Sequence, residues 1–109
     1  MKIVIFQPPY PKEGTKASAA ACLRGIQERL EELTPGEQEL VMLPEYANAP
    51  GLSARQQMRD FAESQGAAFL KAVSASAARL GSLIVLSGVV RSGAHWFNRS
   101  MVFDAQGEI

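Results

Sequence analysis

Short apolar runs alternate along the chain with longer segments in which apolar residues recur at helical spacing. The run at 2–6 is near-continuous in apolarity and rich in β-branched residues, which is typical of a strand buried on both faces of a parallel sheet. The runs at 40–43 and 83–90 also predict strands. A fourth run at 96–103 follows turn formers at 92–94, which predicts an antiparallel hairpin.

The longer segments predict helices. Between the first two strands, a helix is expected from Thr15 or Ser18 to Leu33. Its apolar stripe follows the helical repeat and comprises Ala19, Cys22, Leu23, Ile26, Leu30 and Leu33. A second helical stretch covers 56–65, is interrupted at Gly66 and continues over 67–80. Ser53 is its possible N-cap and Gly81 its C-cap.

These elements predict an α/β fold with a mixed sheet in β-α-β-α-β-β order. Strand, helix and strand over the first forty or so residues form a βαβ unit, so its two strands should be parallel. The residues at 104–107 favour a type I turn, and Glu108 and Ile109 look like the start of another strand. We therefore expect 1–109 to be the N-terminal part of a single larger domain, with no internal boundary.

Composition narrows the class of function. The chain has 109 residues, with eleven acidic and eleven basic side chains, so no net field attracts nucleic acid or an anionic membrane. The apolar runs are too short to span a membrane, and no secretory signal is expected from the first residues. A single cysteine fits the cytoplasm. Neither a phosphate-binding glycine loop nor a metal-binding spacing occurs, so no cofactor is expected.

The strongest candidate for chemistry is Glu45. Pro44 ends the second strand, because proline cannot donate to a sheet ladder, and Glu45 follows at once. Ligands of α/β sheets bind at the carboxyl ends of strands, which is where this carboxylate should lie. Tyr46, Asn48 and Tyr10 are the neighbouring candidates for substrate contacts. The alternative is that Glu45 merely begins a surface loop.

Other polar residues favour structural roles. Gln7 and Tyr10 either border a pocket or are turn residues at a strand end. Cys22 lies on the apolar helical stripe, which favours a small core residue over a nucleophile. His95, the only histidine, lies by the hairpin turn and is expected to be solvated or locally bonded. Asn98 is expected to bond to neighbouring backbone.

Several motifs together resemble the nitrilase, or carbon–nitrogen hydrolase, superfamily. The chain has Gln7-Pro8 after the first strand and Leu43-Pro44-Glu45-Tyr46 after the second. The hairpin carries Asn-x-x-x-Val-Phe-Asp-x-x-Gly-Glu over 98–108, and the motifs follow the family's order over nearly the whole chain. The resemblance implies an α-β-β-α sandwich and a homodimer or higher homo-oligomer that pairs through its helices.

The resemblance also implies a mechanism. The family hydrolyses non-peptide C–N bonds of small amides, carbamoyl compounds or nitriles with a Glu-Lys-Cys triad, in which the cysteine forms an acyl-enzyme. Glu45 matches the general base. The family's lysine and cysteine follow the hairpin, and neither Cys22 nor any lysine of this chain matches them, so these residues alone are expected to be inactive.

Two other interpretations stay open. The chain could be a non-catalytic α/β module that binds a ligand or a partner, since an incomplete sheet has free edges. A flavodoxin-like nucleotide binder would share the early βαβ pattern, but it would lack its phosphate loop and leave the hairpin unexplained.

Overall fold

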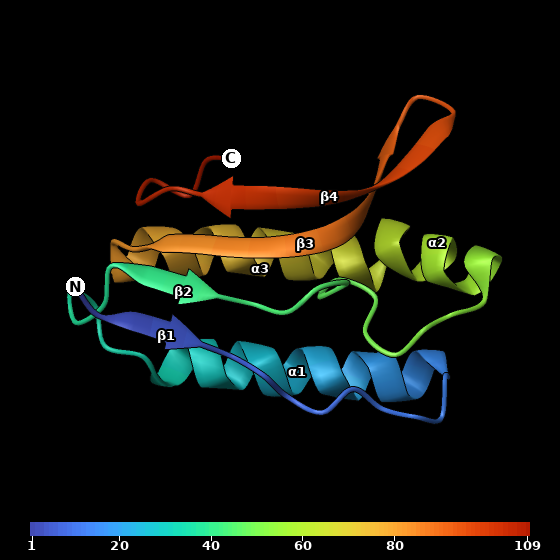
Figure 1. Cartoon of the computed structure of the whole chain (residues 1–109), viewed down its shortest axis with the longest axis horizontal. Helices are drawn as coiled ribbons and strands as arrows, with labels where there is room; N and C mark the ends of the chain where they lie inside the picture. The colour runs from blue at the N-terminus through green and yellow to red at the C-terminus, as the bar shows by residue number, and fades with distance from the viewer.

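The fold is a four-stranded sheet with three helices, described by a computed structural model that covers residues 1–109 (Figure 1). In chain order the elements are β1 (Ile3–Ile5), α1 (Lys16–Glu32), β2 (Leu40–Met42), α2 (Arg55–Glu63), α3 (Gln65–Leu80), β3 (Leu83–Ser92) and β4 (His95–Phe103). Two helices therefore separate β2 from β3, where the expected order had one.

The strands lie in sequence order, β1-β2-β3-β4, and form a mixed sheet as predicted. β1 pairs with β2 in parallel, β2 pairs with β3 in parallel, and β3 pairs with β4 as an antiparallel hairpin. The predicted βαβ unit is confirmed, because α1 connects two parallel neighbours. Consequently β1, β2 and β3 all end at the same edge of the sheet, where Figure 1 shows the loops leaving β1 and β2.

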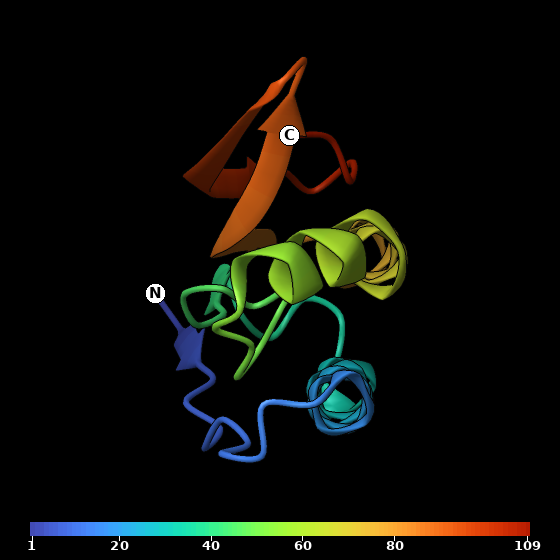
Figure 2. The ribbon, with the colours of Figure 1, turned by 90° about the vertical axis from the view of Figure 1, so that its right-hand side faces the viewer.

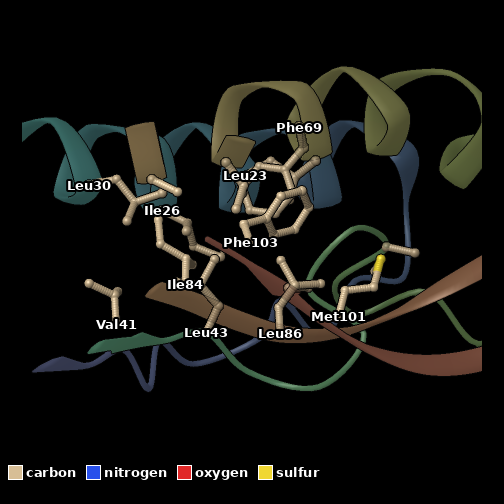
Figure 3. Close-up of a cluster of buried hydrophobic side chains, with 14 of the residues drawn as sticks. Leu23, Ile26, Leu30, Val41, Leu43, Phe69, Ile84, Leu86, Met101 and Phe103 are labelled. Atoms are coloured by element: carbon tan, nitrogen blue, oxygen red, sulfur yellow. The ribbon is translucent and has the colours of Figure 1, made fainter. Parts of the chain in front are cut away.

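The helices cover one face of the sheet only (Figure 2). The core lies between the helices and that face, and Figure 3 shows side chains of α1, α3 and the sheet meeting there. α1 contributes Leu23, Ile26 and Leu30, and α3 contributes Phe69. From the sheet come Val41, Leu43, Ile84, Leu86, Met101 and Phe103. All these side chains are buried.

The other face of the sheet is apolar and open. Ile5 is 58% exposed, and large apolar side chains of the other strands are exposed beside it, namely Ile3, Met42, Leu83 and Val102. The expectation that β1 is buried on both faces is therefore wrong for these residues, since no layer covers its second face. The sequence of β1 is continuously apolar because both of its faces carry apolar side chains, although only one face is covered.

The helix ends show where local sequence decides structure. Thr15 caps α1 in a capping box with Ser18, as one of the two expected starts, and Gly81 ends α3 in the left-handed conformation. Ser53 does not cap α2, since Ala54 holds that position without a side-chain bond. The break between α2 and α3 lies at Ser64, two residues before Gly66.

The C-terminal residues form the predicted turn but no further strand. The backbone N–H of Gly107 donates to the carbonyl of Asp104, at 2.8 Å. Two further backbone N–H groups, those of Gln106 and Glu108, donate to the Asp104 carboxylate. Glu108 and Ile109 lie outside any strand, so the expectation of a fifth strand there is not met by these residues.

Candidate active site

Glu45 lies just beyond the end of β2, at the shared carboxyl edge of the parallel strands. The ladder continues past β2, because the backbone N–H of Leu43 donates to the carbonyl of Val85 at 2.8 Å. Pro44 then has no N–H to offer, and pairing stops. The ladder resumes at Ala47, whose N–H donates to the carbonyl of Ser87 at 3.1 Å. Glu45 is thus lifted out of the sheet between two anchored residues, and its side chain is exposed.

Tyr46 makes the bend that separates Glu45 from the following buried residues. It is the only non-glycine residue of the chain with a positive φ, at 56°. An L-residue pays a steric cost in this left-handed region, so the surrounding structure must hold it there. The carbonyl of Tyr46 accepts the N–H of Ala49 at 3.0 Å, which closes the bend into a tight turn.

Asn48 anchors the loop 44–51 to β3. Its side chain is fully buried, and its amide makes two hydrogen bonds with the backbone of one residue. The amide nitrogen donates to the Val89 carbonyl at 2.8 Å, and the Val89 N–H donates to the amide oxygen at 2.9 Å. Gly88 leaves the space for this amide, since a Cβ there would lie 2.7 Å from the Asn48 oxygen. The geometry therefore gives Asn48 a structural task, and its amide is not open to a substrate.

Tyr10 supports the loop from the opposite side. Its hydroxyl donates to the backbone carbonyl of Glu45 at 2.6 Å. Burial raises the pKa of Tyr10 well above its ordinary value, and Cys22, when it is ionised, and the Glu45 carboxylate raise it further. The phenol thus stays protonated at neutral pH and remains a donor. The hydrogen bond brings Tyr10, a candidate expected near Glu45, into direct contact with it across 35 positions.

Cys22 is half-buried on α1, near Tyr10, and packs against the core. Burial raises the pKa of its thiol, so the reactive thiolate is disfavoured at neutral pH. Cys22 also borders a groove of about 1150 Å³, which runs between α1 and the segment after β1. Gln7 and Tyr10 line the same groove, whereas Glu45 does not. The predicted core role of Cys22 is thus met only in part.

The remaining polar candidates lie apart from Glu45 or on the surface. His95 is exposed at the start of β4, next to the hairpin turn, as expected. Asn98 is also exposed and borders a shallow hollow together with Tyr46. No group of three metal-ligating side chains comes together anywhere in the chain. None of the helices has the length and apolar character needed to cross a membrane.

Sequence reasoning missed the contacts that hold the site together. The Tyr10–Glu45 bond joins a side chain to a carbonyl, and a carbonyl leaves no signal in the sequence. Arg55 and Arg59, which line the hollow with Tyr46, also passed unnoticed. Their spacing of four residues on a helix was the available signal, because it places both on one face.

The chain resembles known proteins over most of its length. The model of the carbon–nitrogen hydrolase family matches residues 2–109. Among solved structures, the chain resembles a CN-hydrolase superfamily protein from Xanthomonas campestris that was solved with an arsenic adduct in its active site. The two share 25% identity at a TM-score of 0.57, over 90% of this chain. The chain spans only 34% of that protein's length. No curated protein matches the chain.

Proposed function

Because the chain belongs to the carbon–nitrogen hydrolase family, we propose that it supplies the general base, Glu45, of an enzyme that hydrolyses non-peptide C–N bonds. The observation that carries the proposal is the state of Glu45. Its backbone carbonyl is held by Tyr10, while its carboxylate is exposed and makes no ion pair in the chain. A base needs this combination, because its position must be fixed and its lone pairs must stay available.

The proposed reaction uses a thiol nucleophile. Glu45 takes the proton of a cysteine thiol, whose sulfur attacks the carbon of an amide, carbamoyl group or nitrile. The C–N bond of an amide then breaks, ammonia or an amine leaves with a proton, and a thioester remains. Glu45 next takes a proton from water, whose oxygen attacks the thioester and releases the acid and the thiol. A lysine stabilises the negative oxygen in both tetrahedral steps.

The nucleophile and the lysine of this proposal lie outside these 109 residues. Cys22 is unsuited to the role, because its thiol is held protonated by burial and has no adjacent cation. The short span relative to the solved relative is consistent with a larger enzyme. We expect the substrate to be small and the enzyme to be cytoplasmic and free of cofactors.

We also propose that a second sheet covers the open face, completing an α-β-β-α sandwich. Ile3, Ile5, Met42, Leu83 and Val102 form an apolar surface that water would otherwise meet. A partner layer would bury it, at a gain of about 25 cal/mol per Å² of apolar area. The helical layer on the opposite side would stay available for the pairing of two subunits that the family resemblance implies.

The open face also favours the second candidate function, a non-catalytic module that binds a partner chain. Both outer strands, β1 and β4, have a free edge, and a free edge can pair with a further strand. This candidate needs no carboxylate at position 45. The two functions therefore differ in what they require of Glu45.

The deciding experiment begins with the intact mass of the natural gene product. A mass more than twice that of these residues is expected, and the purified protein should hydrolyse simple amides or carbamoyl compounds. Glu45→Gln should abolish acyl-enzyme formation, seen as a covalent mass increase, while Glu39→Gln serves as the control. A natural product of 109 residues, or full activity in Glu45→Gln, would contradict the proposal. Turnover by the isolated chain that Cys22→Ala removes would instead make Cys22 the nucleophile.

A further inference from the structure

The residues that carry Glu45 form a bulge beside β3. The loop after β2 continues along β3 (Figure 1), where the N–H of Leu43 donates to the Val85 carbonyl and the N–H of Ala47 to the Ser87 carbonyl. These two bonds lie four residues apart on the loop but only two apart on β3. A regular parallel ladder advances equally on both strands, so here three residues of the loop, with Glu45 at their centre, oppose a single residue of β3. Bulges redirect side chains and are frequent next to active sites.

Tyr46 is the residue of the bulge with the unusual backbone. Its φ is 56°, in the left-handed region, which glycine or asparagine adopts more readily than tyrosine. The backbone on both sides is fixed, because the Glu45 carbonyl accepts the Tyr10 hydroxyl and the N–H of Ala47 is bonded to β3. The dihedral angles of Tyr46 are therefore the joint between two anchored peptides. A change at this joint from the left-handed to the extended region would turn the Glu45 side chain relative to β3.

The side chain of Tyr46 shows how this unfavourable conformation is kept. It is half-buried and lines a hollow of about 170 Å³ together with Met58 of α2, Val89 of β3 and Trp96 of β4. The ring therefore lies between three elements of the fold, and their packing opposes its rotation. A glycine would relieve the steric cost at this position but would leave the joint free to move. The left-handed backbone and the enclosed ring together make the joint rigid.

We propose that Tyr46 is a positioning residue, whose left-handed bend and enclosed ring hold the carboxylate of Glu45 in a fixed direction from the sheet. The inference rests on the proposed function, since it assigns a task to the neighbour of the proposed general base. Tyr46 acts through the backbone and needs no contact with the substrate. Small displacements of a catalytic group slow the chemical step strongly. A change at position 46 should therefore weaken the action of the base and leave substrate binding nearly unaltered.

The test measures how fast iodoacetamide alkylates the nucleophilic cysteine in the natural gene product. In this reaction the thiol gives its proton to the base, its sulfur forms a bond to carbon and iodide leaves, so the rate near neutral pH reports on the base. Proteolysis and mass spectrometry separate this cysteine from Cys22. Because Cys22 is half-buried, its own alkylation would accelerate in a partly unfolded variant. Cys22 therefore serves as an internal measure of folding.

The variants separate the backbone of position 46 from its side chain. Tyr46→Phe keeps the ring, and Tyr46→Gly permits the left-handed backbone without holding it. Tyr46→Val carries a β-branched side chain that disfavours this backbone. Glu37→Gly introduces a glycine into the exposed segment before β2, at the other end of that strand, and is the matched control. Glu45→Asp keeps a carboxylate but shortens its side chain, and it is made alone and together with Tyr46→Gly.

We expect Tyr46→Gly to slow alkylation of the nucleophilic cysteine by roughly ten- to a hundredfold at pH 7, and Tyr46→Val to slow it further. Tyr46→Phe should restore most of the rate, and Glu37→Gly should match the parent. With the base displaced, the pH at which the rate is half-maximal should rise toward the ordinary thiol pKa of about 8.5. Tyr46→Gly should add little to the loss in Glu45→Asp, because Tyr46 acts only through that carboxylate.

Several outcomes would overturn the inference. They are an unchanged rate in Tyr46→Gly, independent losses in Tyr46→Gly and Glu45→Asp that multiply in the double variant, or faster alkylation of Cys22 in Tyr46→Gly. A raised KM for an amide substrate with an unchanged alkylation rate would instead make Tyr46 the substrate contact that the sequence suggested. If Glu45→Gln left the rate unchanged, the proposed function itself would fail. A loss in Glu45→Gln without one in Tyr46→Gly would keep the proposed function and refute the role of Tyr46 alone.

Discussion

The loop 44–51 that carries Glu45 is supported on two sides, and the two supports are built differently. On the inner side, the fully buried amide of Asn48 makes two hydrogen bonds with the backbone of Val89. On the outer side, the half-buried Tyr10 makes one hydrogen bond, to the carbonyl of Glu45 itself. The inner support satisfies backbone groups that would otherwise be buried without partners, whereas the outer support fixes a single exposed peptide.

This difference separates folding from function within one loop. Loss of the inner contact leaves buried polar groups unpaired, and that penalty falls on the whole domain. Loss of the outer contact exposes one carbonyl to water, which replaces the lost bond at little cost. We therefore expect the inner side to control stability and the outer side to control where the carboxylate of Glu45 lies.

The largest expected effect is that of Asn48→Ala. It removes both hydrogen bonds to Val89 and leaves a buried N–H and a buried carbonyl unpaired, at a cost of about 3 kcal/mol in the free energy of unfolding. Urea denaturation measures the change. Asn98→Ala, at an exposed position, should change stability by less than about 0.5 kcal/mol. Similar values for the two variants would show that Asn48 is no structural anchor.

Gly51→Ala tests how closely the segment around Pro11, after β1, packs on the loop 44–51. Gly51 has a φ of +76°, and a Cβ there would lie 2.5 Å from the Pro11 carbonyl oxygen. Gly36 has a similar φ of +82° but faces open space. Gly36→Ala should therefore cost about 1 kcal/mol from backbone strain alone, and Gly51→Ala about 2 kcal/mol. Equal losses of stability in the two variants would mean that Pro11 moves away freely and that its segment does not constrain the loop.

Tyr10→Phe addresses the outer support directly. It removes the hydroxyl that donates to the Glu45 carbonyl and keeps the ring, so we expect a stability loss of only about 1 kcal/mol. In the natural gene product, kcat should fall more than KM changes, because the misplaced base affects chemistry rather than binding. Glu39→Gln is the control, since this exposed side chain makes no hydrogen bond or ion pair in the chain. An unchanged kcat in Tyr10→Phe would remove Tyr10 from the positioning of Glu45.

The sequence was most informative where local rules act. The apolar runs placed all four strands, Thr15 was one of the two starts expected for α1, and Gly81 marked the end of α3. Each of these signals acts through neighbours along the chain. Glu45 could be singled out for the same reason, since Pro44 must stop a strand and the residue after it must leave the sheet.

The features that could not be predicted from the sequence depend on contacts between residues far apart in the chain. The open face of β1 could not be inferred, because an apolar run looks the same whether one face is covered or two. The anchoring of Asn48 to β3 could not be inferred either, because it depends on Gly88, forty positions later, whose lack of a side chain leaves room for the amide. Tyr10 was expected near Glu45, because the parallel pairing of β1 and β2 brings their ends together, but its bond to the Glu45 carbonyl could not be inferred.

The smallest expected effect is a decline in stability at alkaline pH, which should depend on the outer support, Tyr10, and not on the inner support, Asn48. The pKa values of Cys22 and Tyr10 are raised in the folded chain, mainly by burial, so the unfolded chain loses these protons first. Their contribution to stability is therefore complete below about pH 8 and declines as the pH rises past the ordinary thiol and phenol values, about 8.5 and 10. Urea denaturation at several pH values should show this decline. Cys22→Ala should remove its first part and Tyr10→Phe the later part, whereas Asn48→Ala should lower stability equally at every pH. If stability declined with pH to the same extent in all three variants, the titrating groups would be neither Cys22 nor Tyr10.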